Sequence, residues 1–156
     1  MSESFAELQE DFLRITREVV LCTVTTVGSN GRPRSRILHP IWEVRDGNPV
    51  GWVYTLPVGV KASHLAANPY VAVSYWSHAQ EVVLSECLAT WVEDAETKKY
   101  VYDLFNTTPE PIGFDLALFG VDSPESPMFS VLKLEPSRVQ VLTDFPNTFT
   151  PRMAKI

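Results

Sequence analysis

Three arginines stand at alternate positions in one short stretch of this chain, and a lysine opens a later segment. Arg32, Arg34 and Arg36 are separated by single residues, so in a strand they would share one face. Lys61 begins a short helix-like segment, where free backbone N–H groups and the helix dipole also favour an anion. Between these two basic elements lies a strand-like run that ends in a tyrosine and a threonine. Together they predict a site for a phosphorylated, flat, partly apolar ligand.

Each of these residues also has an ordinary structural role open to it. The arginines could solubilise an edge strand and prevent aggregation, and Lys61 could be a surface lysine. Tyr54 could be a core residue and Thr55 an ordinary strand residue. No nucleophile–base pair, paired-carboxylate signature or glycine-rich phosphate loop occurs in the sequence, so no catalytic residue is assigned. If the protein is an enzyme, its chemistry belongs to a bound cofactor.

The elements that would position these residues follow from the apolar periodicity and the turn residues. Apolar residues at helical spacing after Ser4 predict an N-terminal helix, and β-branched runs between Gly, Asn and Pro clusters predict strands. The order predicts a mainly β (α+β) fold in one domain over residues 1–156: a six-stranded antiparallel barrel with two or three flanking helices. The expected helices are 3–18, 60–67 and 93–105; the expected strands are 19–27, 31–42, 50–56, 70–76, 80–92 and 128–142.

Three segments carry more particular expectations. Four prolines bracket residues 106–127, which predicts an ordered excursion with one helical turn. We expect the last strand to be broken at Glu135-Pro136, because proline interrupts a ladder. We expect the tail that ends at Arg152 and beyond to be mobile or docked on a partner.

Composition limits the classes of function. Of the 156 residues, 45% are hydrophobic and 21% are charged, and the net charge of −6 with a pI near 5.0 opposes nucleic-acid binding. The polar, acidic N-terminus and the lack of an apolar run of about 18 residues predict a cytoplasmic protein that does not associate with membranes. Cys22 and Cys87 lie in apolar runs and are interpreted as structural thiols, and no metal site is expected.

The run from Arg36 to Val73 resembles the flavin-binding core of the pyridoxamine 5′-phosphate oxidase-like family, the split β-barrel flavoproteins. The resemblance rests on an arginine before a short apolar strand, a Tyr-Thr pair, a lysine six residues after that threonine, and a helix that closes on Asn-Pro. These features are Arg36-Ile37-Leu38, Tyr54-Thr55, Lys61 and Asn68-Pro69. The fold it implies is a six-stranded antiparallel split β-barrel.

The resemblance also implies roles for individual residues toward flavin mononucleotide (FMN). Lys61 would hold the phosphate. Val60 stands where the family usually has an arginine, so either Arg34 or Arg36 would compensate or the phosphate would be held more weakly. The backbone of Ile37 and Leu38 would run beside the isoalloxazine ring. Thr55, next to Tyr54, would bond the pyrimidine side or the phosphate. Gln80 would be supplied by the other subunit of a homodimer with interfacial sites.

The function expected from this resemblance is that of an FMN-dependent oxidoreductase acting on an unidentified small molecule. Oxidation of pyridoxamine phosphate itself is not expected, because the family's C-terminal arginine-and-histidine motif is missing near Arg152. Two alternatives stay open: a deazaflavin-dependent reductase, in which Arg32 and Arg34 would line a basic groove, and a non-catalytic module that binds flavin or haem. His39 could face the ligand or serve as a capping or solvent-facing residue.

Self-association is also expected from the aromatic content. Four tryptophans and the patch at 114–119 are too much apolar surface for the core of one small barrel, and two-fold dimers are the commonest way to cover such surface. The tryptophans are Trp42, Trp52, Trp76 and Trp91.

Overall fold

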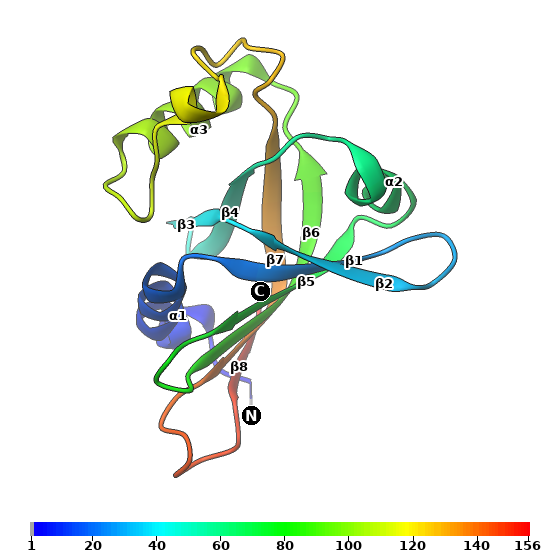
Figure 1. Cartoon of the computed structure of the whole chain (residues 1–156). Coiled ribbons are helices and arrows are strands. Elements are labelled where there is room, and N and C mark those ends of the chain that lie inside the picture. Colours follow the sequence, from blue (N-terminus) through cyan, green and yellow to red (C-terminus); the bar gives the residue numbers. More distant parts are fainter. Residues whose placement is uncertain (1) are drawn as a thin grey trace.

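Antiparallel strands make up most of the computed structural model, which describes residues 2–156 (Figure 1). The helices are α1 (Phe5–Val19), α2 (Gly59–Ala67), α3 (Ala95–Thr107) and the 3₁₀ turn η1 (Leu116–Phe119). The strands are β1 (Cys22–Val27), β2 (Pro33–Leu38), β3 (Pro40–Arg45), β4 (Asn48–Tyr54), β5 (Tyr70–Trp76), β6 (Val82–Trp91), β7 (Val131–Leu142) and β8 (Arg152–Lys155). No helix within residues 2–156 combines the length and the apolar character needed to cross a bilayer.

The sheet curls because its two ends are joined through a single residue. The strand order is β2-β1-β5-β6-β7-β4-β3, with β8 added beside β7, yet only His39 separates β2 from β3 in the chain. β2 pairs with β1 and β3 pairs with β4, so the chain changes partner at His39. Pro40, which has no N–H to donate, begins an edge strand, where proline is tolerated. The predicted mainly β barrel with flanking helices is confirmed.

The number of strands differs from the expected six for two reasons. The basic strand expected to reach Trp42 ends at Leu38, because the chain changes pairing partner there and continues as β3. A further short strand, β8, forms at the C-terminus. The structure therefore has eight strands in one sheet.

The expected break at Glu135-Pro136 is wrong. β7 runs without interruption from Val131 to Leu142. Cys87 of β6 pairs with Pro136, whereas the preceding Glu86 pairs with Arg138, which leaves Ser137 as an extra residue in β7. Such a bulge disrupts the ladder locally, so the missing proline N–H costs little.

The C-terminal tail is docked on its own chain. β8 pairs with the second half of β7, and the Arg152 guanidinium lies 3.2 Å from Glu3 and 3.1 Å from Asp11. Arg152 also donates a hydrogen bond to the backbone carbonyl of Glu7. The tail therefore closes over the start of α1, and neither mobility nor a partner is needed to explain it.

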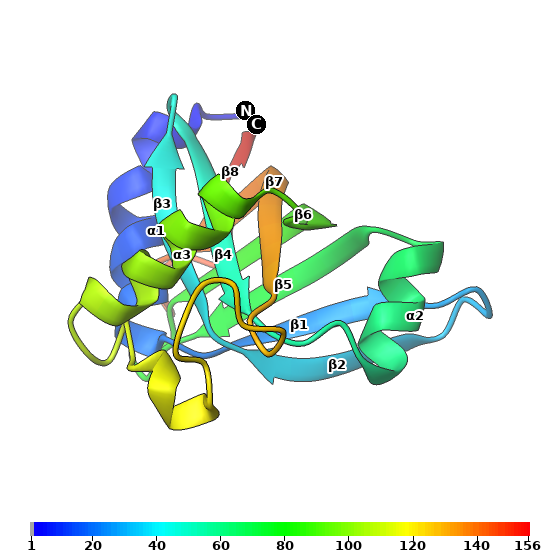
Figure 2. The same ribbon diagram turned by 90° about the horizontal axis from the view of Figure 1, so that it is seen from above.

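Helices at two places on the sheet produce two apolar cores. α1 begins where the Glu7 carboxylate accepts hydrogen bonds from the N–H and Oγ of Ser4, as in a capping box. It buries one face against the inside of the curled sheet, and α3 with η1 covers the opposite side of β4 (Figure 2). β4 is consequently buried on both faces along most of its length. The residues that α1 buries are Phe5, Leu8, Phe12, Ile15 and Thr16.

Two of the four tryptophans lie in the core. Trp42 and Trp52 are almost fully buried, and the Trp42 indole donates a 2.9 Å hydrogen bond to the Tyr75 hydroxyl. Burial raises the pKa of both Cys22 and Cys87 to about 12, which leaves them as unreactive thiols at neutral pH. By contrast, Trp76 is 69% exposed on the outside of the sheet.

Candidate functional site

Arg36 from β2, Thr55 after β4 and Lys61 from α2 converge at one place. The Lys61 ammonium donates a hydrogen bond to Thr55 Oγ1. Partial burial lowers the pKa of Lys61, and the nearby positive charge of Arg36 lowers it further. Arg36 is itself half-buried and donates a 3.2 Å hydrogen bond to the carbonyl of Val24. The two cations are therefore held close together although they repel each other.

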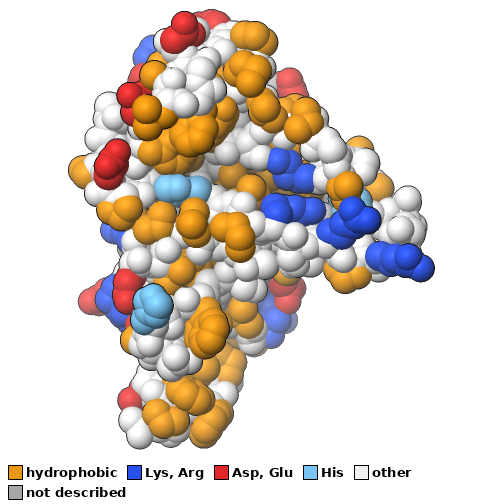
Figure 3. All heavy atoms as spheres, in the orientation of Figure 1, with side chains coloured by type: hydrophobic (Ala, Val, Ile, Leu, Met, Phe, Trp, Pro, Cys, Tyr) orange, Lys and Arg blue, Asp and Glu red, His pale blue; other side chains and the backbone are white. Residues whose placement is uncertain are grey.

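Within the described part of the chain, neither cation has a carboxylate to neutralise it. None of the ion pairs among residues 2–156 includes Arg32, Arg34, Arg36 or Lys61. The net charge of the chain is −6, so acidic side chains are plentiful elsewhere. Figure 3 shows Lys and Arg side chains gathered over α2 and β2. Uncompensated, partly desolvated cations of this kind favour an anionic ligand.

The first turn of α2 leaves backbone N–H donors without a side-chain cap, close to Lys61. α1 starts with the Ser4–Glu7 pair, and α3 starts with Asp94, whose carboxylate accepts from the N–H of Thr97 at 2.8 Å. The residue before α2 is Val58, which has no side-chain oxygen and makes no cap. The first N–H groups of α2 are thus left for another acceptor, beside Lys61.

The remaining residues of β2 lie along the edge of the sheet. Arg34 shares the face of Arg36 by strand alternation and is exposed. Ile37 points the other way and is 60% exposed, whereas Leu38 is half-buried against the main core. Within residues 2–156, β2 pairs with β1 alone, so its outer edge keeps free backbone N–H and C=O groups. Arg32 precedes β2, in the turn.

Tyr54 is not directed at the cations. Its ring stacks on Phe129 with centroids 5.9 Å apart and lies 5.9 Å from Phe119, in the core under α3 and η1. Since successive side chains of a strand alternate in direction, Tyr54 packs in that core while Thr55 meets Lys61.

Gln80 lies far from Lys61 within one chain. It sits in the turn between β5 and β6, where its side-chain oxygen accepts a 3.1 Å hydrogen bond from the Trp76 indole. Figures 1 and 2 both place this turn at the end of the molecule opposite α2. A contribution of Gln80 to the site would need a second chain and stays a prediction.

His39 has a partner inside the protein. Its Nε2–H donates a 2.8 Å hydrogen bond to the carbonyl of Ile112, and its ring lies 4.9 Å from that of Phe114. Burial lowers the pKa of His39, and the bond to Ile112 opposes this shift. The histidine fastens the loop after α3 to the corner between β2 and β3.

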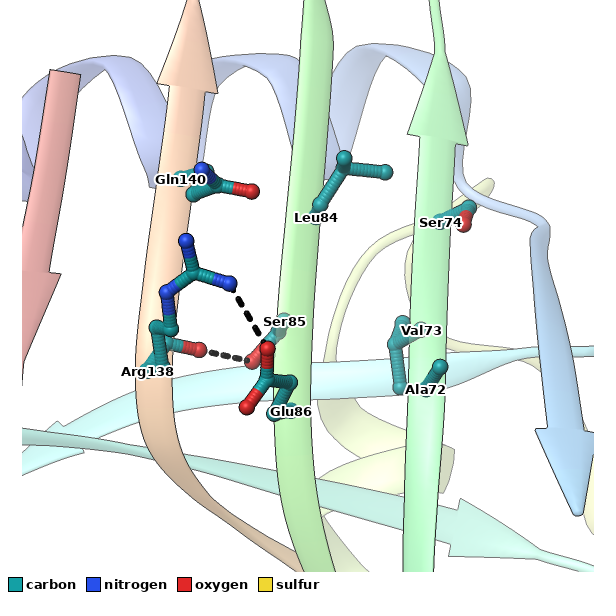
Figure 4. A pocket seen from close by; sticks show the side chains of 8 residues that line it. All are labelled: Ala72, Val73, Ser74, Leu84, Ser85, Glu86, Arg138 and Gln140. Atoms are coloured by element: carbon teal, nitrogen blue, oxygen red, sulfur yellow. Dashed lines mark hydrogen bonds and ion pairs between the residues drawn. The ribbon is translucent and has the colours of Figure 1, made fainter. Parts of the chain in front are cut away.

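A separate hollow lies on the outer face of β5, β6 and β7 (Figure 4). Its only arginine, Arg138, is 2.7 Å from the Glu86 carboxylate, and the Arg138 carbonyl accepts a hydrogen bond from Ser85. This guanidinium is already neutralised, in contrast to those on β2. Among residues 2–156, no group of three His, Cys, Asp or Glu side chains is placed to bind a metal ion.

Sequence reasoning missed the groups that hold the cations. The Val24 carbonyl is a backbone group and leaves no trace in the sequence. His64, one turn after Lys61 on α2, is buried and bonded to Thr26. Its helical spacing from Lys61 was the one available signal.

A curled antiparallel sheet closed at one corner, with helices packed against it, defines a small split β-barrel protein. The family model described as pyridoxamine 5′-phosphate oxidase matches residues 8–143, and the chain belongs to this family. No curated protein sequence matches the chain.

Solved structures share the fold at low sequence identity. General stress protein 26 from Bacillus anthracis superposes with a TM-score of 0.68 at 20% identity, over 96% of this chain and 99% of that one. A pyridoxamine 5′-phosphate oxidase-related, FMN-binding protein from Nostoc punctiforme gives 0.66 at 16% identity, over 99% and 97%. A haem-binding protein from Mycobacterium smegmatis gives 0.61 at 18% identity, over 90% of this chain and 55% of that one. The same fold thus occurs in proteins described as binding different cofactors.

Proposed function

We propose that this protein binds FMN at Arg36, Thr55 and Lys61 and is a flavin-dependent oxidoreductase acting on a small molecule. The observation that carries the proposal is the pair of close, partly buried cations that lack any carboxylate partner within residues 2–156. They lie beside the uncapped start of α2, which suits a phosphate dianion. Membership of the family and the FMN-binding relative support flavin as the ligand.

The residues present fit such a ligand, and each has a distinct task. Lys61 and the first N–H groups of α2 hold the phosphate, and Arg36 balances its second charge. Thr55 orients the Lys61 ammonium, and Arg34 extends the positive surface along β2. The free edge of β2 at Ile37 and Leu38 offers backbone groups to the polar rim of a flat ring. A bound flavin would supply the hydride chemistry, and these residues orient it and stabilise negative charge.

We further propose a homodimer in which Gln80 of one chain completes the site of the other. The outer face of β5 and β6 exposes large apolar side chains that no part of residues 2–156 covers: Tyr70 (66%), Trp76 (69%), Leu84 (40%) and Leu88 (37%). The hollow of Figure 4 lies on this same face. Exposed apolar area of this kind is typical of a protein–protein interface.

A deazaflavin is the second candidate ligand, favoured by the exposed arginines on and before β2. Arg32 and Arg34 have no ion-pair partner among the described residues and could hold an anionic extension. Binding of haem has less support, because Nε2 of His39 is bonded to the Ile112 carbonyl and the buried His64 ring packs its Nε2 against Gly28. The third histidine, His78, is exposed in the turn between β5 and β6.

The absorbance spectrum of the purified protein, with mass spectrometry of the released ligand, tests the cofactor. We expect a yellow protein that absorbs at about 450 nm and releases FMN. Absorbance at shorter wavelength indicates a deazaflavin, and a Soret band indicates haem. A colourless protein that takes up no added FMN contradicts the proposal. For the activity, the bound flavin is reduced anaerobically and its reoxidation by candidate small molecules is followed.

A further inference from the structure

A buried polar pair fastens α2 to the first strand of the sheet. The His64 ring is 9% exposed, and its Nδ1 lies 3.0 Å from the hydroxyl of Thr26, which is itself only 1% exposed. Buried polar groups of this kind are costly to leave without a partner, so the bond specifies one position of the helix. Lys61 stands one turn earlier on the same helix and therefore moves with His64.

Gly28, just after β1, makes room for this ring. A Cβ built on Gly28 would lie 2.6 Å from both Cδ2 and Nε2 of His64, closer than real side chains approach. Gly28 is not among the glycines with positive φ, so the backbone there would accept an alanine. The glycine is needed because the histidine ring packs directly against it.

The same strand also fixes the second cation. The carbonyl of Val24 on β1 accepts the hydrogen bond from Arg36, and Thr26, two residues further on, holds His64. β1 thus sets the distance between the Arg36 guanidinium and the helix that carries Lys61. The other deep anchor of α2 is Leu65, an apolar contact that restricts rotation of the helix less specifically than a hydrogen bond.

We infer that Thr26, Gly28 and His64 form a latch that positions Lys61 and so sets the preference for a phosphorylated ligand over its unphosphorylated form. The inference rests on the proposed function, because it concerns the same phosphate site. His64 is a positioning residue: it acts through the placement of Lys61 and touches no ligand itself. The latch should therefore affect a ligand's phosphate and leave the binding of its ring unchanged.

FMN and riboflavin separate these two effects, because they share a ring and differ by the phosphate. We expect Thr26→Val, which removes the hydroxyl at nearly constant shape, to weaken FMN binding about 5- to 30-fold, the scale of a lost buried hydrogen bond. Riboflavin affinity should not change. Thr26→Ser restores the hydroxyl and should restore FMN affinity. Gly28→Ala, which displaces the ring, should reproduce the effect of Thr26→Val.

Thr16→Val is the matched control, because Thr16 is an equally buried threonine on α1 whose hydroxyl bonds to the carbonyl of Phe12. It should leave the ratio of FMN to riboflavin affinity unaltered. The latch is refuted if Thr26→Val and Gly28→Ala weaken the binding of FMN and riboflavin equally. It is also refuted if neither folded variant loses FMN affinity. Either result leaves the proposed FMN site standing. Should Thr26→Val fail to fold, as judged by circular dichroism, Gly28→Ala carries the test. Wild-type protein that binds neither ligand overturns the proposed function as well.

Discussion

Lys61 differs from an ordinary surface lysine through its three polar neighbours. Thr55 accepts its hydrogen bond, Arg36 repels it, and the start of α2 places unsatisfied N–H groups beside it. Burial and Arg36 lower the pKa of Lys61, and an anion bound between the two cations would raise it again. Binding of a phosphate would therefore relieve a repulsion that the folded protein already contains.

Replacing Lys61 with alanine should weaken FMN binding by about 1.5–3 kcal/mol, the usual scale for a charge-assisted hydrogen bond. Titration followed by flavin fluorescence measures the effect. Lys155→Ala, an exposed lysine on β8, serves as the control and should bind like the wild type. Equal affinity of the Lys61 variant and the wild type would show that Lys61 is a surface residue.

Arg36→Ala should impair retention of the cofactor more than Arg32→Ala does. Arg36 is half-buried, is fixed by the Val24 carbonyl and lies close enough to Lys61 to lower its pKa. Arg32 is exposed in the turn before β2, where it is free to point into solvent. Flavin per chain after purification is the measurement, and equal retention in the two variants argues against the assigned register of β2.

The residues of the site that could be predicted from the sequence are polar residues at a fixed local spacing. Thr55 and Lys61 are six residues apart at the start of a helix, and the structure joins them by a hydrogen bond. The support behind them could not be predicted, because Val24 contributes a backbone carbonyl and Thr26 reaches His64 across 38 residues of chain. Such contacts depend on how β1 and α2 pack.

Among the secondary-structure elements, the corner between β2 and β3 has the largest effect on the shape of the sheet. His39 is the only residue between two strands that pair with different partners, and its ring ties this corner to Ile112 in the loop after α3. Because Arg36 precedes this corner by only three residues, the loop contributes indirectly to the position of the site.

Acidification should weaken this corner. Since burial lowers the pKa of His39, the folded protein favours the neutral ring. The contribution of this neutral ring to the free energy of unfolding is fully present above the unfolded pKa of about 6.5 and is lost as the pH falls below that value. His39→Gln keeps an N–H donor but does not titrate. When the pH is lowered from about 7.5 to about 5, we expect its free energy of unfolding to fall by less than that of the wild type. Urea unfolding at both values measures this. The same loss in wild type and His39→Gln would refute the assignment.

His78→Gln is the control for this comparison, because His78 is exposed in the turn between β5 and β6. It should show the same pH dependence as the wild type. If His78→Gln reduced the pH dependence of the free energy of unfolding as much as His39→Gln does, exposed histidines would account for the effect.

Secondary-structure elements with a regular alternation of residues could be predicted from the sequence. Elements whose limits depend on pairing with a neighbouring strand could not. The strand expected over residues 70–76 is observed with the same ends, because its alternation and the preceding Asn68-Pro69 are both local signals. The basic strand is divided at His39 because the part before it pairs with β1 and the part after it pairs with β4. Continuity of β7 through Pro136 follows from a bulge opposite Glu86 and Cys87, which only the neighbouring strand reveals.

For the molecule as a whole, residues 2–156 leave the outer face of β5 and β6 uncovered. α1 and α3 bury their own parts of the sheet and take Trp42 and Trp52 into the cores. The outer surface of β5 and β6 keeps Tyr70, Trp76 and other apolar side chains exposed. No helix of the described chain lies over that face in Figure 1 or Figure 2.

We therefore expect an obligate homodimer that holds its flavin at the subunit interface. The exposed apolar face of β5 and β6 would be covered by a second copy, and the turn with Gln80, distant from α2 in its own chain, would reach the partner's site. Leu84→Lys places a charge on this face and should shift the protein to monomers and release flavin together, whereas Lys98→Ala on α3 should do neither. Light scattering during dilution, with flavin fluorescence recorded in parallel, follows both changes. A stable monomer that retains flavin would contradict this arrangement, because a complete site would then exist within one chain.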